Sequence, residues 1–131
     1  MALKLTLKPH EKIIVNGAVL SNGPSKTTFS IQNTAVILRQ KDILTEEQAN
    51  TPAKRIYFCL QMAYLDEEHE RDYLEKANHL VREFVEAVPT DEVRGILEPV
   101  GADVSKRNYF PALKQLRKLI AFEDKRLTYG R

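Results

Sequence analysis

The 131-residue sequence has no tryptophan, one cysteine, five glycines, six prolines and no long apolar run. A single cysteine cannot form an internal disulfide, which excludes a disulfide-stapled secreted domain. The longest unbroken apolar run is five residues, whereas a membrane-spanning helix needs roughly 20. Lys4, Lys8 and Lys12 leave no room for the apolar region of a signal peptide. We therefore expect a cytoplasmic protein that has no contact with a membrane.

Motifs for catalysis, nucleotide binding and metal binding are also missing. No glycine-rich loop precedes a helix pattern, which excludes the P-loop and Rossmann fingerprints. The three histidines are too dispersed for a recognisable metal site. Cys59 lies in an apolar stretch, and we expect it to be a buried, inert thiol. The acidic residues at positions 66–70 fit a solvated helix start. We expect no enzyme activity, no cofactor and no metal.

Charge is strongly segregated along the chain, although the net charge is only +2. Residues 1–45 carry a net charge of +4, residues 46–103 carry −8, and residues 104–131 carry +6. A basic surface attracts polyanions because binding releases counterions. The basic ends could equally bind the acidic middle, within one chain or between subunits. The pattern alone leaves both interpretations open.

The first 45 residues have the periodicity of short β-strands. Leu3, Leu5 and Leu7 alternate with polar residues, as in a strand with one buried face. Asn16-Gly17 is the dipeptide of a type I′ hairpin turn. Further strand patterns cover residues 13–15, 18–20, 27–32 and 35–39.

The pattern becomes helical near Thr45, where Thr45 and Gln48 fit a capping box. Thr51-Pro52 marks the start of one helix, and Asp66 is expected to cap the next, which ends at residue 88. We expect a short, weaker helix at residues 90–98, broken by Pro99 and Gly101. The final helix is expected to be capped by Ser105 and to reach residue 127.

These patterns predict an α+β fold. A small N-terminal antiparallel β unit, sheet or barrel-like, covers residues 1–45 and packs with a C-terminal helical unit of three to four helices at residues 46–131. So small a β unit leaves edges exposed, and forming a homo-oligomer is one way to cover them.

The final helix carries the clearest candidate site. Its apolar face is expected to contain Tyr109, Leu113, Leu116, Ile120 and Leu127. The opposite face carries basic residues at spacing i, i+7, i+11 and i+18, which spans roughly 27 Å along a helix. Such a line can follow a phosphate backbone. An ordinary solvated face, or a surface for an acidic protein, would show the same pattern. The four residues are Arg107, Lys114, Lys118 and Lys125.

A second basic group lies in the β unit. Lys4 and Lys8 share the outward face of the first strand, while Arg39 and Lys41 follow the last strand. If these two strands pair, the four residues form one patch. Phe29 is the only aromatic residue in this region, and its alternation suits the core. The sequence therefore favours attraction to an RNA backbone over base readout.

Ordered segments across nearly the whole chain resemble the flagellar regulator family FlbT. The resemblance starts with Leu-Lys-Leu-Thr-Leu-Lys-Pro at residues 3–9 and is weakest between residues 82 and 104. The other segments that carry it are residues 11–12, 16–18, 41–43, 51–53, 56–58, 62–67, 112–113, 117–120 and 123–124.

The resemblance to FlbT implies a post-transcriptional regulator of flagellum biogenesis. Such a protein associates with the 5′ untranslated region of flagellin mRNA and promotes degradation of that mRNA or represses its translation. The resemblance implies no catalytic residues and assigns no RNA contacts, so the eight basic candidates rest on charge geometry. A weaker similarity of the first residues to the carbon storage regulator CsrA, which binds mRNA leaders, favours Lys4, Lys8 and residues 39–41.

An alternative is a protein-interaction module that affects flagellin mRNA only indirectly. It would bind flagellin, a flagellar chaperone or another flagellar regulatory protein. Its interface would be the acidic middle of the chain, with Tyr57, Tyr64 and Tyr73. An exposed apolar groove between helices would favour this alternative.

Overall fold

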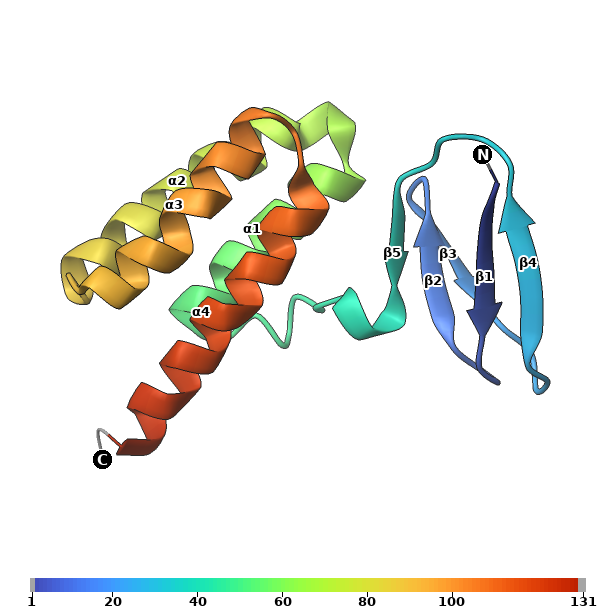
Figure 1. Cartoon of the computed structure of the whole chain (residues 1–131), viewed down its shortest axis with the longest axis horizontal. Coiled ribbons are helices and arrows are strands. Elements are labelled where there is room, and N and C mark those ends of the chain that lie inside the picture. The colour runs from blue at the N-terminus through green and yellow to red at the C-terminus, as the bar shows by residue number, and fades with distance from the viewer. Residues whose placement is uncertain (1, 130–131) are drawn as a thin grey trace. The chain divides into compact units, whose positions relative to one another are not determined.

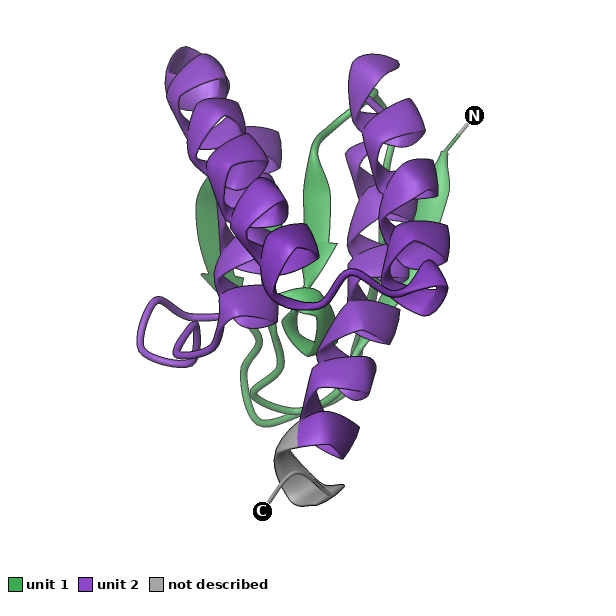
Figure 2. Ribbon diagram, turned by 90° about the vertical axis from the view of Figure 1, so that its left-hand side faces the viewer, with its two compact units in different colours: residues 1–43 green, residues 44–131 purple. Residues whose placement is uncertain are grey.

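The computed structural model describes residues 2–129, with side chains as far as residue 126. The chain divides into two compact units, residues 1–43 and residues 44–131, coloured separately in Figure 2. The first unit contains the strands and the second contains the helices (Figure 1). The expected α+β fold is confirmed.

The β unit consists of two small antiparallel sheets. In one sheet, β1 (Leu3–Leu7) pairs with β4 (Thr27–Ile31). In the other, β2 (Lys12–Val15) lies between β3 (Ala18–Ser21) and β5 (Ile37–Arg39). A 3-10 turn, η1 (Gln40–Asp42), follows β5. All five expected strands are therefore present, with small shifts at their ends.

Alternation of side chains builds the core of the β unit. Leu5, Leu7 and Ile13 are buried and form one cluster. Phe29 lies opposite Leu5 in the β1–β4 register and packs against this cluster, so the expectation that it is a core residue is confirmed. Residues between these positions point to the other face, because successive strand residues alternate. Lys4 and Thr6 therefore lie on the polar face of β1.

The Asn16-Gly17 dipeptide forms the tight turn between β2 and β3. Val15 pairs with Ala18, so the loop has two residues. Both have positive φ, 50° for Asn16 and 84° for Gly17, as a type I′ turn requires. The Asn16 side chain also accepts a hydrogen bond of 2.9 Å from the Val36 N–H. The turn thus fixes both the β2–β3 register and the approach to β5.

The described part of the helical unit contains four α-helices. They are α1 (Pro52–Leu65), α2 (Glu70–Ala87), α3 (Asp91–Ser105) and α4 (Tyr109–Tyr129), with a 3-10 turn, η2 (Glu67–His69), before α2. α1 packs against both α2 and α4, and α3 packs against α4 (Figure 1). Among the described residues, no helix combines the length and the apolar character needed to cross a bilayer.

Threonine caps begin two of the helices. The Thr51 side chain accepts a hydrogen bond from the Lys54 N–H with Pro52 at the first helical position, as predicted. Thr90 does the same for α3 through the Val93 N–H. Thr45 and Gln48 exchange the two hydrogen bonds of a capping box, but only a turn follows. Asp66 precedes η2 but makes no side-chain capping hydrogen bond, because its side chain binds His69 instead, and the residue before α2 is His69.

Two expected helix boundaries are wrong. α3 does not break at Pro99 and Gly101 but continues to Ser105. The apolar side chains on one face of α3 supply the packing that overrides the poor propensity of both residues. Consequently Ser105 ends α3 rather than capping the final helix, and α4 begins at Tyr109. The buried residues of α3 are Val93, Ile96, Leu97 and Val100.

A buried glutamine fixes the start of the helical unit. Gln61 on α1 is only 3% exposed. Its Oε1 accepts a 2.7 Å hydrogen bond from the Leu44 N–H, and its Nε2 donates a 2.8 Å bond to the Leu44 carbonyl. The amide therefore satisfies both backbone groups of Leu44, the first residue of this unit.

We predict that Gly17→Ala destabilises the protein. A Cβ at φ 84° is strained, so the free energy of unfolding should fall by roughly 1 kcal/mol. Urea denaturation followed by circular dichroism measures the change. Gly23→Ala is the matched control, because a Cβ there meets nothing within 4 Å. Equal stability of the two variants would contradict the type I′ turn.

Candidate nucleic-acid interface

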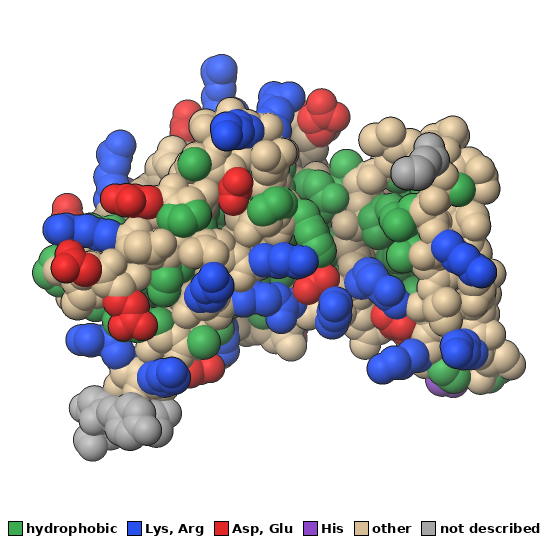
Figure 3. All heavy atoms as spheres, viewed as in Figure 1, with side chains coloured by type: hydrophobic (Ala, Val, Ile, Leu, Met, Phe, Trp, Pro, Cys, Tyr) green, Lys and Arg blue, Asp and Glu red, His purple; other side chains and the backbone are tan. Residues whose placement is uncertain are grey.

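The buried face of α4 determines which side chains reach solvent. Tyr109, Leu113 and Leu116 on this face are at most 6% exposed. Lys114, Lys118 and Lys125 lie on the other side and are exposed. Figure 3 shows Lys and Arg side chains gathered over α4. Leu127, also expected on the apolar face, lies outside the described side chains.

We call Lys114, Lys118 and Lys125 the lysine row. The first and last of them are 11 positions apart, about 17 Å along a helix. The acids in the described part of α4 are Glu123 and Asp124, and Glu123 is buried on the opposite face. The row therefore presents positive charge along three turns of one helix.

Arg107 does not belong to this row, so its expected place on the final helix is wrong. It lies in the turn between α3 and α4 with a φ of 60°. Its backbone N–H donates a 2.9 Å hydrogen bond to the Val104 carbonyl, which helps to close the end of α3. Its guanidinium Nη2 lies 3.0 Å from Glu70 Oε1 on α2. Arg107 is thus held by an acidic residue of the middle segment.

Glu70 also fixes the first residue of α4. The Tyr109 hydroxyl donates a hydrogen bond to Glu70 Oε2, while Arg107 bonds the other oxygen. Burial, and then this hydrogen bond, raise the pKa of Tyr109 above its ordinary value. The hydroxyl therefore stays protonated and remains a donor, which locks the start of α4 against α2.

Phe110 is a candidate contact that the sequence analysis missed. It is 36% exposed, and Lys114 Nζ lies 5.0 Å from the centre of its ring. An exposed ring beside a cation can stack a base while the cation meets a phosphate. The i, i+4 spacing of Phe110 and Lys114 is the sequence signal that could have identified the pair.

The basic residues of the β unit do not form the patch that strand pairing would have given. β1 pairs with β4, not with β5. Lys4, Lys8 and Lys41 are exposed. Arg39 is half-buried, and its Nη2 donates a 2.6 Å hydrogen bond to the carbonyl of Thr6 on β1. Arg39 therefore ties the two sheets together.

Glu11 completes the environment of Arg39. Its Oε2 lies 3.4 Å from Arg39 Nη2, and its Oε1 accepts a 2.8 Å hydrogen bond from the Lys8 N–H. That backbone hydrogen bond, followed by the charge of Arg39, lowers the pKa of Glu11. Glu11 is thus ionised at neutral pH and compensates the charge of Arg39, which reduces the attraction of Arg39 for a phosphate.

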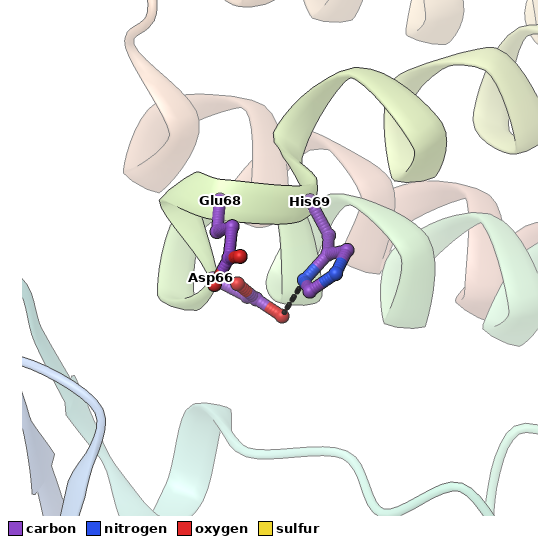
Figure 4. A group of neighbouring side chains, drawn as sticks. All are labelled: Asp66, Glu68 and His69. Carbon is purple, nitrogen blue, oxygen red and sulfur yellow. Dashed lines mark hydrogen bonds and ion pairs between the residues drawn. The ribbon is translucent and has the colours of Figure 1, made fainter.

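The acidic turn before α2 gathers three potential metal ligands. One ligand atom each from Asp66, Glu68 and His69 lies within 4.8 Å of the others (Figure 4). His69 Nδ1 and Asp66 Oδ2 are 2.9 Å apart. The hydrogen bond to Asp66, together with the charge of Asp66, raises the pKa of His69. The hydrogen bond between Asp66 and His69 holds these two side chains together without a metal ion, and Glu68 and His69 are exposed to solvent.

A groove runs along α1 and α2 of the helical unit. It consists of two adjoining cavities of about 580 and 700 Å³ that share Arg55 and Leu80. Phe58 lines the first cavity and Phe84 lines the second. Cys59 also lines the first, and burial raises the pKa of its thiol, which fits the inert cysteine expected.

The acidic middle provides fewer surface aromatics than the protein-interaction hypothesis assumed. Tyr57 is 3% exposed and belongs to the core. Tyr64 is partly buried, and its ring centre lies 6.0 Å from that of Tyr109. Tyr73 is partly exposed on α2. An interface built on all three tyrosines is therefore ruled out by the burial of Tyr57.

Comparison with known proteins gives one consistent result. The profile of the family described as flagellar protein FlbT matches residues 3–127. The chain is 45% identical to a probable flagellum biosynthesis repressor protein FlbT of Caulobacter sp. (strain K31), over 98% of each chain. It is 42% identical to the flagellum biosynthesis repressor protein FlbT of Caulobacter vibrioides, over 98% of this chain and 92% of the relative. A probable FlbT of Rhodopseudomonas palustris is 41% identical over 98% and 99%. No solved structure matches.

We predict that Asp66→Asn lowers the pKa of His69 towards the ordinary value of a histidine. The pair stabilises the fold at low pH, and this contribution disappears as the pH rises through the raised pKa of His69. An NMR titration of the imidazole resonances measures the shift. Glu67→Gln is the control, because Glu67 is not among the groups that act on His69. Equal His69 pKa values in Asp66→Asn and the unmodified protein would contradict the pairing.

Proposed function

The chain belongs to the FlbT family of flagellar proteins, and we propose that it regulates flagellum biosynthesis by binding flagellin mRNA. It binds the 5′ untranslated region and promotes degradation of the mRNA or represses its translation. The names of its relatives, flagellum biosynthesis repressor, support a negative regulator. Binding to RNA is the step for which the structure offers candidate residues.

The single observation that carries this proposal is the exposed lysine row on α4 with Phe110 beside it. Lysine ammonium groups bind phosphates as point charges, and counterion release makes such binding favourable. Phe110 adds a stacking surface for an unpaired base. A leader RNA offers both chemical groups where its bases are not paired. α4 is a regular helix packed on α1, so the cations have a fixed spacing.

The other basic candidates contribute unequally to the proposed binding of RNA. In the β unit, considered by itself, the exposed Lys4, Lys8 and Lys41 provide phosphate contacts. Arg39 and Arg107 contact Glu11 and Glu70 and contribute less, since an RNA phosphate would compete with these carboxylates. The protein supplies binding, and a nuclease or a change in RNA structure supplies the decay step.

A second candidate function is favoured by the apolar-lined groove along α1 and α2. In this alternative the chain binds a flagellar protein, and that partner carries the RNA specificity. Binding of purified protein to a flagellin mRNA leader and to a scrambled RNA, across a salt series, separates the two. Selective binding to the leader supports direct recognition. Equal, weak binding to both RNAs that disappears at moderate salt supports the alternative.

We predict that Lys114→Glu together with Lys118→Glu weakens binding to the leader by more than about tenfold. The slope of log K against log salt should become shallower by about 0.7 for each phosphate that the protein no longer neutralises. Fluorescence anisotropy measures both quantities. Lys76→Glu with Arg82→Glu on α2 changes the net charge equally and serves as the matched control. Similar weakening by the two double variants would remove the lysine row from the site.

Phe110→Ala should weaken binding without changing the salt slope, because stacking releases no counterions. A stacked base contributes about 1–3 kcal/mol, so we expect at least roughly a fivefold loss of affinity. The same anisotropy titration provides the readout. Lys118→Ala is a useful contrast, since it should change the slope. An unchanged affinity for Phe110→Ala would exclude a stacking role.

A further inference from the structure

The strand β3 is an exposed edge of the β unit. It pairs with β2 on one side, and no described strand pairs with its other side. All four of its residues are exposed, including two large apolar ones, Val19 at 62% and Leu20 at 46%. An open strand edge displays N–H and C=O groups that can pair with another strand.

The sequence of β3 lacks the features that usually protect an edge. Ala-Val-Leu-Ser contains neither a charged residue nor a proline. By contrast, β1 carries Lys4 and β5 carries Arg39, while β4 has no charged residue but exposes only the polar Thr27, Thr28 and Ser30. Charged side chains and prolines on edge strands discourage pairing with a further strand. β3 is therefore chemically suited to strand pairing.

Leu20 lies on the face of its sheet that forms the core. It is paired directly with Ile13, and paired residues on neighbouring antiparallel strands share a face. Ile13 is fully buried, whereas Leu20 is 46% exposed. The apolar face of the sheet therefore extends past the residues that the β1–β4 sheet covers. The exposed part of this apolar face is small and ends at the unpaired edge of β3.

The hydrogen-bond pattern shows which backbone groups are free at this edge. A two-residue turn closes on a hydrogen-bonded pair, Val15 with Ala18, and such pairs recur at every second position. The next one is Ile13 with Leu20, and the 2.9 Å bond from the Asn22 N–H to the Glu11 carbonyl continues the series. The N–H and C=O groups of Val19 and Ser21 therefore point away from β2.

We propose that a second copy of this chain pairs antiparallel with β3 to form a homodimer. The twofold axis passes beside Leu20, so that Val19 of each copy exchanges hydrogen bonds with Ser21 of the other. This register uses every outward-pointing backbone group of β3, whereas a shift of two residues uses fewer. It also places Leu20 directly opposite its own copy, on the core face.

A second copy is the occupant that fits this edge best. A twofold axis perpendicular to the sheet keeps the two faces distinct, so the apolar face continues from one copy into the other. The two three-stranded sheets then form one continuous sheet. A β unit of 43 residues has a thin core, and association is a common way to stabilise units of that size. This inference is independent of RNA binding.

The oligomeric state of the full chain tests the proposal. Light scattering or sedimentation over a concentration series should give twice the monomer mass. Leu20→Lys should give a monomer, because it puts like charges directly opposite each other. Leu3→Lys is the matched control and should remain a dimer, since Leu3 is 48% exposed but lies on β1. A wild-type monomer at every concentration, or a dimer that persists in Leu20→Lys, would overturn the proposal.

Crosslinking tests the register and does not depend on the folding of the lysine variant. Cβ atoms of directly opposed residues that are not hydrogen-bonded to each other lie close enough for a disulfide after a small adjustment. Oxidised Leu20→Cys should therefore run as a covalent dimer. Leu3→Cys and the unmodified protein, whose Cys59 is buried, should not. Equal crosslinking of Leu3→Cys and Leu20→Cys would contradict pairing through β3.

Discussion

Packing of α1 against both α2 and α4 is the constraint that orients the rest of the helical unit. Ala53 and Ala63 on α1 are almost fully buried, and small side chains allow neighbouring helices to approach closely. At the N-terminus of α1, the Ala53 N–H donates a 3.0 Å hydrogen bond to Glu123 on α4. A carboxylate is favourable there because the helix dipole is positive at that end. The same contact turns Glu123 inward, so the exposed charges of α4 are mainly those of its lysines and arginines, and Asp124 is the one exposed acid among the described side chains of this helix.

The charged residues that produce the segregation of charge along the chain have different roles in the structure. One part of it is internal to the helical unit, where Arg107 near the basic end binds Glu70 in the acidic middle. This contact fits the interpretation in which the basic ends of the chain bind its acidic middle. The lysine row takes no part in the ion pairs found among the described side chains. The two interpretations of the charge pattern therefore apply to different residues. Whether the row binds RNA stays a prediction.

Local rules predicted most of the fold and only part of the candidate site. Asn16-Gly17 forms a turn and Thr51-Pro52 starts a helix because of the backbone preferences of these residues themselves. The sequence was therefore enough to place both. The orientation of Lys114 and Lys118 follows from the apolar period of α4. The role of Arg39 could not be predicted from local sequence rules, because Arg39 donates a hydrogen bond to a strand of the other sheet. The start of α4 was misplaced because packing carried α3 past Pro99.

The continuation of α3 through Pro99 has a consequence for the local unfolding of the protein. Pro99 has no N–H to offer the carbonyl of Gly95, and a proline inside a helix costs about 3 kcal/mol of helix stability. Gly95 and Gly101 add backbone entropy to the unfolded form without any steric need for glycine, since a Cβ at either position would meet nothing within 4 Å. α3 is therefore stable only while Val93 and its apolar neighbours rest on α4. We therefore expect α3 to be a segment of low local stability in the native ensemble and to exchange its amide hydrogens before α1 does.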